Sequence, residues 1–494
     1  MLVTCRQMSE AEDRLFSNGA SPEPYMDDAG RQCAEAIQRF FPRPSSVEVF
    51  VGKGNNGGDA LVVARRLKER GWRVNLNFSH GPDEISELAA KKLREFENSR
   101  VGDSRLAGSP LVVVDGLLGI GAKGDLRGGI REQADRINTL RRERFATCFA
   151  IDIPTGLNAD TGVPGEGAVR ADYTLSICLP KAGFAADEAI DHVGRLVEIP
   201  LDIPVAEGDD SRRFLFPSNL LPRLERRLFD THKGHSGRVV VVAGSRGMAG
   251  AAILVAQAAS RTGSGLVTVC VLEDIYPVVA ANCSPEIMVR PVKSHEEAGE
   301  IRCDVLAIGP GLGSEFDDAV LELVSSHEAA AVVDADGLNA LSRNKERLKS
   351  LPSNRMLTPH PGELARLTDR REGRVDVTRV LADEWGVTLL HKGARTAIAS
   401  PGRPVELNTT GHPGMASGGM GDVLTGVCAS LAGQGLDLHD AACVGSWLLG
   451  SAAEAARDRE GVAAESVTAA TVFEHLGHAL GALHAGTDST GSGN

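Results

Sequence analysis

The stretch VEVFVGKGNNGGDALVVARRL, residues 47–67, decides the fold class of the first half of this 494-residue chain. A short apolar strand runs through glycines 52, 54 and 57 into a helix-like segment, as in the first βα turn of a parallel sheet. The bare GxGxxG spacing fits a dinucleotide site, but it also fits a generic tight turn. The second strand ends in NLNFSH, without the acid that usually binds ribose. An ordinary NAD-dependent dehydrogenase site is therefore not expected.

Short apolar strands alternate with helical segments along both halves of the chain, which predicts parallel βαβ sheets. Prolines and dense charge in residues 201–237 place a boundary near 215–230. We expect two α/β domains, residues 1–215 and 226–485, and a disordered polar tail at 486–494. The expected strands are 47–52, 73–79, 111–117, 148–154 and 172–178, and then 238–244, 266–272, 305–310, 330–336 and 387–393.

The composition excludes several classes of protein. A net charge of −13 and an aromatic fraction of 4% do not suit a nucleic-acid binder. There is no apolar run of about 18 residues, so no membrane span is expected. The nine cysteines are scattered without a CxxC pair. Together with an N-terminus that lacks a signal-peptide pattern, they indicate reduced thiols in a cytoplasmic protein.

Polar side chains follow three strands that are expected to end at the same edge of the first sheet. Asn56 opens the helix after the first strand, Asp115 ends the third, and Asp152 and Thr155 follow the fourth. Each alone would be explained as a helix cap or turn residue. Ligands bind outside the carboxyl ends of parallel strands, so their joint placement predicts one ligand crevice.

The segments GNNGGD, DGLLGIG and AIDIPTGLNADTG resemble the signature segments of the NAD(P)H-hydrate epimerase domain, over about residues 1–215. The resemblance implies a Rossmann-like three-layer α/β/α domain with a potassium ion held by Asn56, Asp115 and Thr155, and Asp152 acting at C6 of the substrate. Two departures are Ala60, where the family commonly has glycine, and Thr155, where serine is common. The implied substrate-binding residues are Asn55, Asn56, Gly57, Gly58, Asp59, Gly119, Ile120, Gly121, Ala122, Lys123, Gly124, Asp125 and Asp152.

The second half carries further polar and glycine-rich turns after expected strands. IGPGLG spans 308–313, VVDADGLN 332–339, TPHPGELARL 358–367 and HKGARTAI 391–398. His360 lies between two prolines, where a structural and a catalytic role fit equally well. Lys392 and Thr396 flank a glycine turn that would suit a diphosphate. No GxxxxGK[ST] motif occurs, so a P-loop is excluded.

These segments, together with KGHSGRVVVVAGS and GGMGDVLTG, resemble the ribokinase-like ADP/ATP-dependent NAD(P)H-hydrate dehydratase domain over about 231–485. The resemblance implies Asp422 as the catalytic base. Met420 departs from the usual threonine. The implied contacts to the hydrated nucleotide are Ala251, Gly311, Gly313, His360 and Asp422, and those to the adenine nucleotide are Lys392, Gly393, Ala394, Arg395, Thr396 and Gly421.

The two resemblances predict one bifunctional repair enzyme. It would epimerise R and S forms of NAD(P)H hydrate at C6 and dehydrate the S form to NAD(P)H, using ADP and giving AMP and phosphate. ATP remains open as the donor, Mg²⁺ is expected with it, and a homo-oligomer is expected. The alternative is a vitamin-precursor kinase with an accessory Rossmann binding or scaffold domain.

The stretch GGMGD, residues 418–422, leaves a question about Asp422. Glycines before a helix suit an anion, because free N–H groups and the helix dipole attract negative charge. A carboxylate there is either a helix N-cap or a base that faces the substrate hydroxyl rather than the phosphate. Loss of an N-cap side chain costs about 1 kcal/mol and spares activity, whereas loss of a base removes activity.

Overall fold

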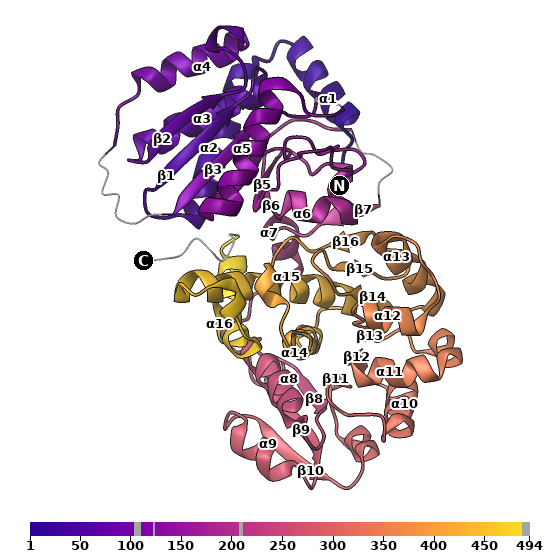
Figure 1. Cartoon of the computed structure of the whole chain (residues 1–494). Helices are drawn as coiled ribbons and strands as arrows, with labels where there is room; N and C mark the ends of the chain where they lie inside the picture. The colour runs from indigo at the N-terminus through magenta and orange to yellow at the C-terminus, as the bar shows by residue number, and fades with distance from the viewer. Residues whose placement is uncertain (103–109, 122–123, 207–210, 487–494) are drawn as a thin grey trace. The chain divides into compact units, whose positions relative to one another are not determined.

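The computed structural model describes residues 1–102, 110–121, 124–206 and 211–486. The chain forms two compact units that divide between residues 206 and 211 (Figure 1). Within the described ranges, no helix combines the length and apolar character needed to cross a bilayer. All nine cysteines are free thiols, as the sequence predicts.

The first unit is built on a six-stranded, fully parallel sheet of order β2-β1-β3-β4-β5-β6. This confirms the predicted Rossmann-like α/β architecture. The strands are β1 (Ser46–Val51), β2 (Arg73–Phe78), β3 (Leu111–Gly116), β4 (Thr147–Ile151), β5 (Tyr173–Ile177) and β6 (Arg195–Ile199). The helices are α1 (Cys5–Ser17), α2 (Pro22–Phe40), α3 (Asn55–Glu69), α4 (Glu87–Asn98), α5 (Gly128–Arg144) and the short α6 (Ile190–Val193).

Both faces of the central strands of this sheet are buried, which explains why β3 and β4 are nearly continuous apolar runs, whereas the edge strand β2 alternates polar and apolar residues. Val47, Val49 and Val51 of β1 pack in one core with α2 and α3. Phe50 points to the opposite face and packs in a second core with α5. The alternation along β1 therefore produces the three-layer arrangement of helices, sheet and helices visible in Figure 1.

Strand order reverses between β1 and β3, so the crevice of this sheet opens above their carboxyl ends. Two glycines permit the turn after β1 to lie close to its neighbours. A Cβ at Gly52 would lie 1.8 Å from the carbonyl oxygen of Leu117, and one at Gly57 would lie 1.9 Å from that of Gly52. Gly54 has open space, so only two glycines of the GxGxxG spacing are required by packing.

The second unit contains a ten-stranded sheet of order β10-β9-β8-β11-β12-β13-β14-β15-β16-β7. It is parallel from β10 to β14, and β15 is antiparallel to both of its neighbours. The strands are β7 (Arg212–Phe214), β8 (Arg238–Val242), β9 (Leu266–Leu272), β10 (Met288–Val292), β11 (Val305–Ile308), β12 (Ala330–Val333), β13 (Arg355–Leu357), β14 (Thr388–His391), β15 (Ala397–Ala399) and β16 (Val405–Leu407).

A large core of the second unit lies between its sheet and the helices α8, α14, α15 and α16. Strand order reverses between β8 and β11, and the loops after these strands are joined by the bond from Gly244 N to Pro310 O at 2.8 Å. The helices are α7 (Pro217–Leu220), α8 (Ala249–Arg261), α9 (Tyr276–Asn282), α10 (Asp317–Ser326), α11 (Asp336–Arg343), α12 (Pro361–Leu367), α13 (Arg374–Trp385), α14 (Met420–Gly433), α15 (Leu438–Glu460) and α16 (Ala469–His484).

Strand β7 shows where the expected boundary differs from the structure. Residues 211–215 are expected in the first domain, but β7 pairs in parallel with β16 and belongs to the second unit. A three-residue strand carries no periodicity that names its partner sheet, so only the fold assigns it. Apart from Gly486, the expected disordered tail at 486–494 lies outside the described residues.

Candidate active sites

Asp115 and Thr155 meet at the carboxyl edge of the first sheet, as the sequence predicts. The hydroxyl of Thr155 donates to Oδ1 of Asp115 at 2.7 Å, and the Thr155 N–H donates to Oδ2 at 2.8 Å. Both residues are fully buried. Burial raises the pKa of Asp115 to about 6, although these bonds and one from Leu117 N oppose the rise. The site therefore holds a buried carboxyl whose charge lacks full compensation.

Asn56 lies beside this pair, on the first turn of α3. Its amide nitrogen donates to Leu118 O at 2.9 Å, and Leu118 N donates to the Thr155 hydroxyl at 3.2 Å. A Cβ on Gly119 would lie 3.9 Å from Oδ1 of Asn56, so the side chain faces the second glycine turn. The three predicted potassium ligands are thus connected through one short loop.

Asp152 follows β4 with a φ of 60°, a strained conformation for a residue with a side chain. Its Oδ1 accepts from Lys181 Nζ at 2.5 Å and from Ile177 N at 3.1 Å. The side chain of Lys181 is 1% exposed and that of Asp152 is 13% exposed. Sequence reasoning missed Lys181. Its position in LPKAG, directly after an apolar strand, was the signal that could have found it.

Two further carboxyl groups surround Asp152. Burial and the charge of Asp152 raise the pKa of Glu12, on α1, and that of Asp59, on α3. Asp59 was predicted as a site residue and Glu12 was not. Nothing in the local pattern of α1 distinguishes Glu12 from its acidic neighbours, so only the fold places it here.

The other predicted residues of the first site lie around the same edge. Asn55 is exposed, while Gly57 and Gly58 are buried in the turn. Ile120 packs with Met8 and Ala11 of α1. Gly121, Gly124 and Asp125 are exposed, and Ala122 and Lys123 lie outside the described residues. Ala60 is buried, and a Cβ on Gly116 would lie 2.4 Å from its methyl group, so the alanine is accommodated by the glycine of β3.

The second unit gathers charged side chains at the carboxyl ends of β12 and β14. Lys392 Nζ donates to Oδ1 of Asp334 at 2.6 Å and lies 3.7 Å from Oε2 of Glu363. Thr425, on α14, donates to Oδ2 of Asp334 at 3.0 Å. Burial alone would lower the pKa of Lys392, but the neighbouring carboxylates of Asp334 and Glu363 hold it above its ordinary value.

Asp334 was not singled out from the sequence, although it ends a strand in the same way as Asp115. It lies in VVDADGLN and is 1% exposed. Ala335, directly after it, has a φ of 48°, which turns the chain sharply between β12 and α11. The strained turn fixes Asp334 against Lys392 and Thr425.

Asp422 lies in the first turn of α14 but does not cap it. The N-cap is Gly419, at a φ of 88°, which places Asp422 three positions further along the helix. The N-cap interpretation of Asp422 is therefore wrong. Burial raises the pKa of Asp422 to about 6, the charge of Asp334 adds to the rise, and Lys392 opposes it.

Met420, where the family usually has threonine, points into the core and is 7% exposed. Its side chain therefore does not line the outer surface of the glycine turn.

The predicted dehydratase residues lie on neighbouring loops. A Cβ on Gly311 would lie 2.9 Å from the methyl group of Ala251, so these two residues are in close proximity. Gly313 N donates to Oδ2 of Asp336 at 2.8 Å. His360 caps α12, because its Nδ1 accepts from Gly362 N at 3.0 Å. Its side chain is 51% exposed, so the cap leaves the ring accessible.

The predicted nucleotide loop, residues 392–396, is divided between exposed and buried positions. Gly393 and Ala394 are exposed. Arg395 is 3% exposed, and its guanidinium lies 5.3 Å from the ring centroid of Phe214 on β7. Thr396 is 8% exposed and donates to Gly393 O at 3.1 Å. The side chain of Arg395 thus packs within the fold, so its backbone, rather than its side chain, forms part of the surface of this loop.

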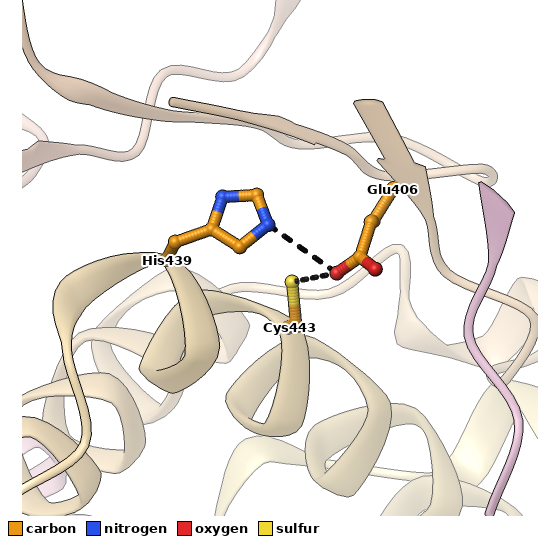
Figure 2. A group of neighbouring side chains, drawn as sticks. All are labelled: Glu406, His439 and Cys443. Carbon is orange, nitrogen blue, oxygen red and sulfur yellow. Dashed lines mark hydrogen bonds and ion pairs between the residues drawn. The ribbon is translucent and has the colours of Figure 1, made fainter. Parts of the chain in front are cut away.

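A second cluster of titratable side chains lies between β16 and α15 (Figure 2). Glu406, His439 and Cys443 are buried, and their ligand atoms lie within 4.8 Å of one another. Arg223 donates to both carboxylate oxygens of Glu406, at 2.6 and 2.7 Å, and Cys443 donates to Oε2 at 2.8 Å. Because these bonds already compensate the carboxylate, we interpret the cluster as a hydrogen-bonded network that joins α15 to the sheet edge.

Comparisons with known proteins agree with this geometry. Residues 23–183 match the family YjeF-related protein N-terminus, and residues 239–476 match the family NAD(P)H-hydrate dehydratase. The chain is 38% identical to the bifunctional NAD(P)H-hydrate repair enzyme Nnr of Moorella thermoacetica, over 93% of each chain. It is 32% identical to the enzyme of that name from Coxiella burnetii, over 96% of this chain and 98% of the other.

A solved structure supports the fold of the second unit. A ribokinase-like superfamily protein from Enterococcus faecalis V583 matches with a TM-score of 0.50 and 24% identity. The match covers 58% of this chain and 100% of the other. The predicted ribokinase-like architecture is thereby confirmed.

Proposed function

The chain belongs to the family of bifunctional NAD(P)H-hydrate repair enzymes, and on that premise we propose how its two units divide the work. The first unit epimerises NAD(P)H hydrate at C6 in the crevice above β1, β3 and β4. The second dehydrates the S epimer to NAD(P)H with a nucleotide phosphoryl donor. The single observation that supports this division best is that each unit holds its own carboxylate, Asp152 or Asp422, at the carboxyl edge of its own sheet.

Dehydration needs the C6 hydroxyl to become a good leaving group. Phosphoryl transfer to that oxygen supplies one. The lone pair of the ring nitrogen can then expel phosphate to give an iminium, and loss of a proton from C5 restores the double bond. We assign Asp422 as the base that takes the hydroxyl proton. A base with a pKa of about 6 is ionised at neutral pH and still accepts a proton readily.

Charge neutralisation in this step falls to the backbone and to Lys392. The first N–H groups of α14 have no partner within the helix, and a polyanion placed there is favoured by the helix dipole. A Cβ on Gly421 would lie 3.3 Å from Lys392 Nζ, so the ammonium flanks the same helix end. We propose that Asp334 orients Lys392 toward the transferred phosphoryl group.

A Mg²⁺ ion would accompany the nucleotide. Carboxylate oxygens are suitable hard ligands, and magnesium usually keeps several waters and substrate phosphates. Both oxygens of Asp334 already accept hydrogen bonds, and Asp422 is assigned as the base. The ion would therefore be held mainly by the phosphates of the nucleotide, where it would neutralise charge.

The function is tested with chemically hydrated NADH. The reduced-nicotinamide absorbance should recover with ADP or ATP and stay absent without a nucleotide. The donor that gives the higher kcat/KM is the physiological candidate, and ADP is the expected one. Accumulation of a stable phosphorylated product without recovery would instead support the vitamin-precursor kinase.

The potassium proposal rests on the chemistry around Asp115. Its carboxyl, the Thr155 hydroxyl and the Asn56 amide supply hard oxygen donors from three elements that the loop after β3 links, which fits an alkali cation. Burial raises the pKa of Asp115 to about 6, so a cation would supply the missing compensation. Bound K⁺ would fix this loop beside the substrate.

Potassium should change how stability depends on pH. Because its folded-state pKa is raised, Asp115 stabilises the fold fully below its unfolded pKa, and this contribution is lost as pH rises through about 6. The loss amounts to as much as about 3 kcal/mol, and K⁺ should offset part of it. Because the loss accrues between the ordinary pKa of 3.8 and about 6, thermal unfolding from about pH 3.5 to 8 in KCl and in choline chloride measures it. Asp115→Asn should abolish the difference between the salts, and identical wild-type curves would contradict the site.

A further inference from the structure

Lys181 is buried beside the proposed epimerisation residue, and its ammonium uses all of its donors on fixed partners. It donates to Oδ1 of Asp152 at 2.5 Å, to Ile177 O at 3.0 Å and to Leu179 O at 3.1 Å. With three N–H groups and three acceptors, it has none left for a substrate. Any effect of Lys181 on the reaction must therefore pass through Asp152.

The two oxygens of Asp152 are in different situations. Oδ1 accepts from both Lys181 and Ile177 N, whereas no described residue donates a hydrogen bond to Oδ2. The side chain is 13% exposed, so it reaches the surface of the crevice. This arrangement fixes one oxygen within the fold and leaves the other for the substrate.

The segment that carries Lys181 is itself fixed. Val3 forms a parallel bridge with Lys181, through bonds from Val3 N to Pro180 O at 3.0 Å and from Ala182 N to Val3 O at 2.8 Å. This bridge also anchors the start of α1, which carries Glu12. The position of the ammonium is thus determined by the sheet edge and by the N-terminal segment together.

We propose that Lys181 is a positioning residue for epimerisation, which holds the Asp152 carboxylate charged and aims its free oxygen at the C6 hydroxyl. This inference rests on the proposed epimerase function of the first unit. Burying an ammonium group costs free energy unless the group is paired. The buried Lys181 beside the reacting carboxylate therefore has either this positioning role or a purely structural one.

The other titratable groups around this pair act in the opposite sense. Four acids and thiols from α1, α3 and the loop after β5 face it, and a further thiol lies on α2. They would disfavour the charge of Asp152 when ionised, which leaves Lys181 as the cation that opposes them. These groups are Glu12, Asp59, Cys5, Cys178 and Cys33.

The test is Lys181→Met, which keeps the length of the side chain and removes its charge. Epimerisation is followed without nucleotide, as the exchange of R and S epimers resolved by chromatography, above the uncatalysed rate. We expect kcat to fall at least about tenfold and the acid limb of the pH–rate profile to move upward by about one to three pH units, because an attractive charge is withdrawn. Lys181→Arg, which restores a cation, should recover part of the rate.

Lys92 on α4 offers a matched control. It is also 1% exposed, and it is paired with Glu23, Asp27 and Glu95 rather than with a site residue. Lys92→Met should lower the melting temperature without moving the pH–rate profile. A purely structural role for Lys181 would give the same pattern, a lower melting temperature and an unmoved acid limb, and would overturn the proposal.

Two outcomes distinguish a failure of this inference from a failure of the proposed epimerase function. If the wild-type enzyme does not accelerate epimerisation, the proposed epimerase function fails. If the wild type is active, Asp152→Asn is inactive and Lys181→Met keeps the wild-type rate and profile, only the role of Lys181 fails. Should Lys181→Met fold poorly, the pH profile of Lys181→Gln decides, with an unmoved acid limb again overturning the proposal.

Discussion

Asp422→Asn is expected to lower the rate of dehydration by about 10²–10⁴-fold while epimerisation continues at the wild-type rate. The substitution removes the assigned base and keeps the size of the side chain. Recovery of NADH from its S hydrate in the presence of ADP measures the loss. Exchange between the epimers, measured without nucleotide, reports on the first unit of the same sample.

The pH dependence of dehydration by the wild-type enzyme also tests the assignment of Asp422 as the base. Because burial raises the pKa of Asp422 to about 6, dehydration should decline as pH falls through about 6. The raised pKa also means that ionised Asp422 costs stability above this pH. Asp422→Asn should therefore be more stable than the wild type at pH 7.5, by about 1–2 kcal/mol once solvent screening of this partly buried group is allowed for.

Asp437 provides the control for the helix-cap explanation. It is a true N-cap, since its side chain accepts from Asp440 N at 2.9 Å at the start of α15. Asp437→Ala should lower stability by about 0.5–2 kcal/mol and leave dehydration unchanged. If Asp422→Asn behaved in the same way, less stable and still active, its assignment as the base would be wrong.

Asp152→Asn is expected to reduce epimerisation by about 10²–10⁴-fold and to spare dehydration of the S epimer. Asparagine keeps an oxygen that can accept from Lys181, so the buried ammonium retains a partner. With a mixture of R and S hydrates and ADP, the wild-type enzyme should convert all of the substrate. The variant should pause once the S epimer is consumed and then proceed at the uncatalysed rate of epimerisation.

The control for this experiment is Asp135→Asn in the same unit. Asp135 is half exposed on α5, where it pairs with Arg131 at 2.9 Å. It should give the wild-type progress curve. Complete conversion by Asp152→Asn at the wild-type rate would contradict its assignment.

The fold class and the outline of each site could be predicted from local sequence. Alternating apolar strands and helices fix a parallel sheet, and a parallel sheet brings the carboxyl ends of its strands to one edge. Asp115 and Thr155 were therefore placed together from sequence, and they lie within 2.7 Å. The segments that carry the family resemblance are these same strand ends and glycine turns.

Other residues were beyond local reasoning, because their roles depend on partners far away in the sequence. Lys181 meets Asp152 across 29 positions, and Lys392 meets Asp334 across 58. Glu12 reaches the first site because α1 is anchored there by contacts distant in sequence, such as the pairing of Val3 with Lys181 and the packing of Met8 and Ala11 against Ile120. The buried side chain of Arg395 depends on β7 joining the second sheet.

The stretch GGMGD shows the division most clearly. Its residues predicted a glycine turn that opens a helix, and this is correct. They left the role of Asp422 open, because an N-cap and a third helical position differ only in the backbone angles of the glycines. Sequence by itself determined which elements form and which turn chemistry they carry, since these depend on neighbouring residues. Tertiary structure decided which charges meet, since burial and long-range pairing set the pKa and the orientation of each carboxylate.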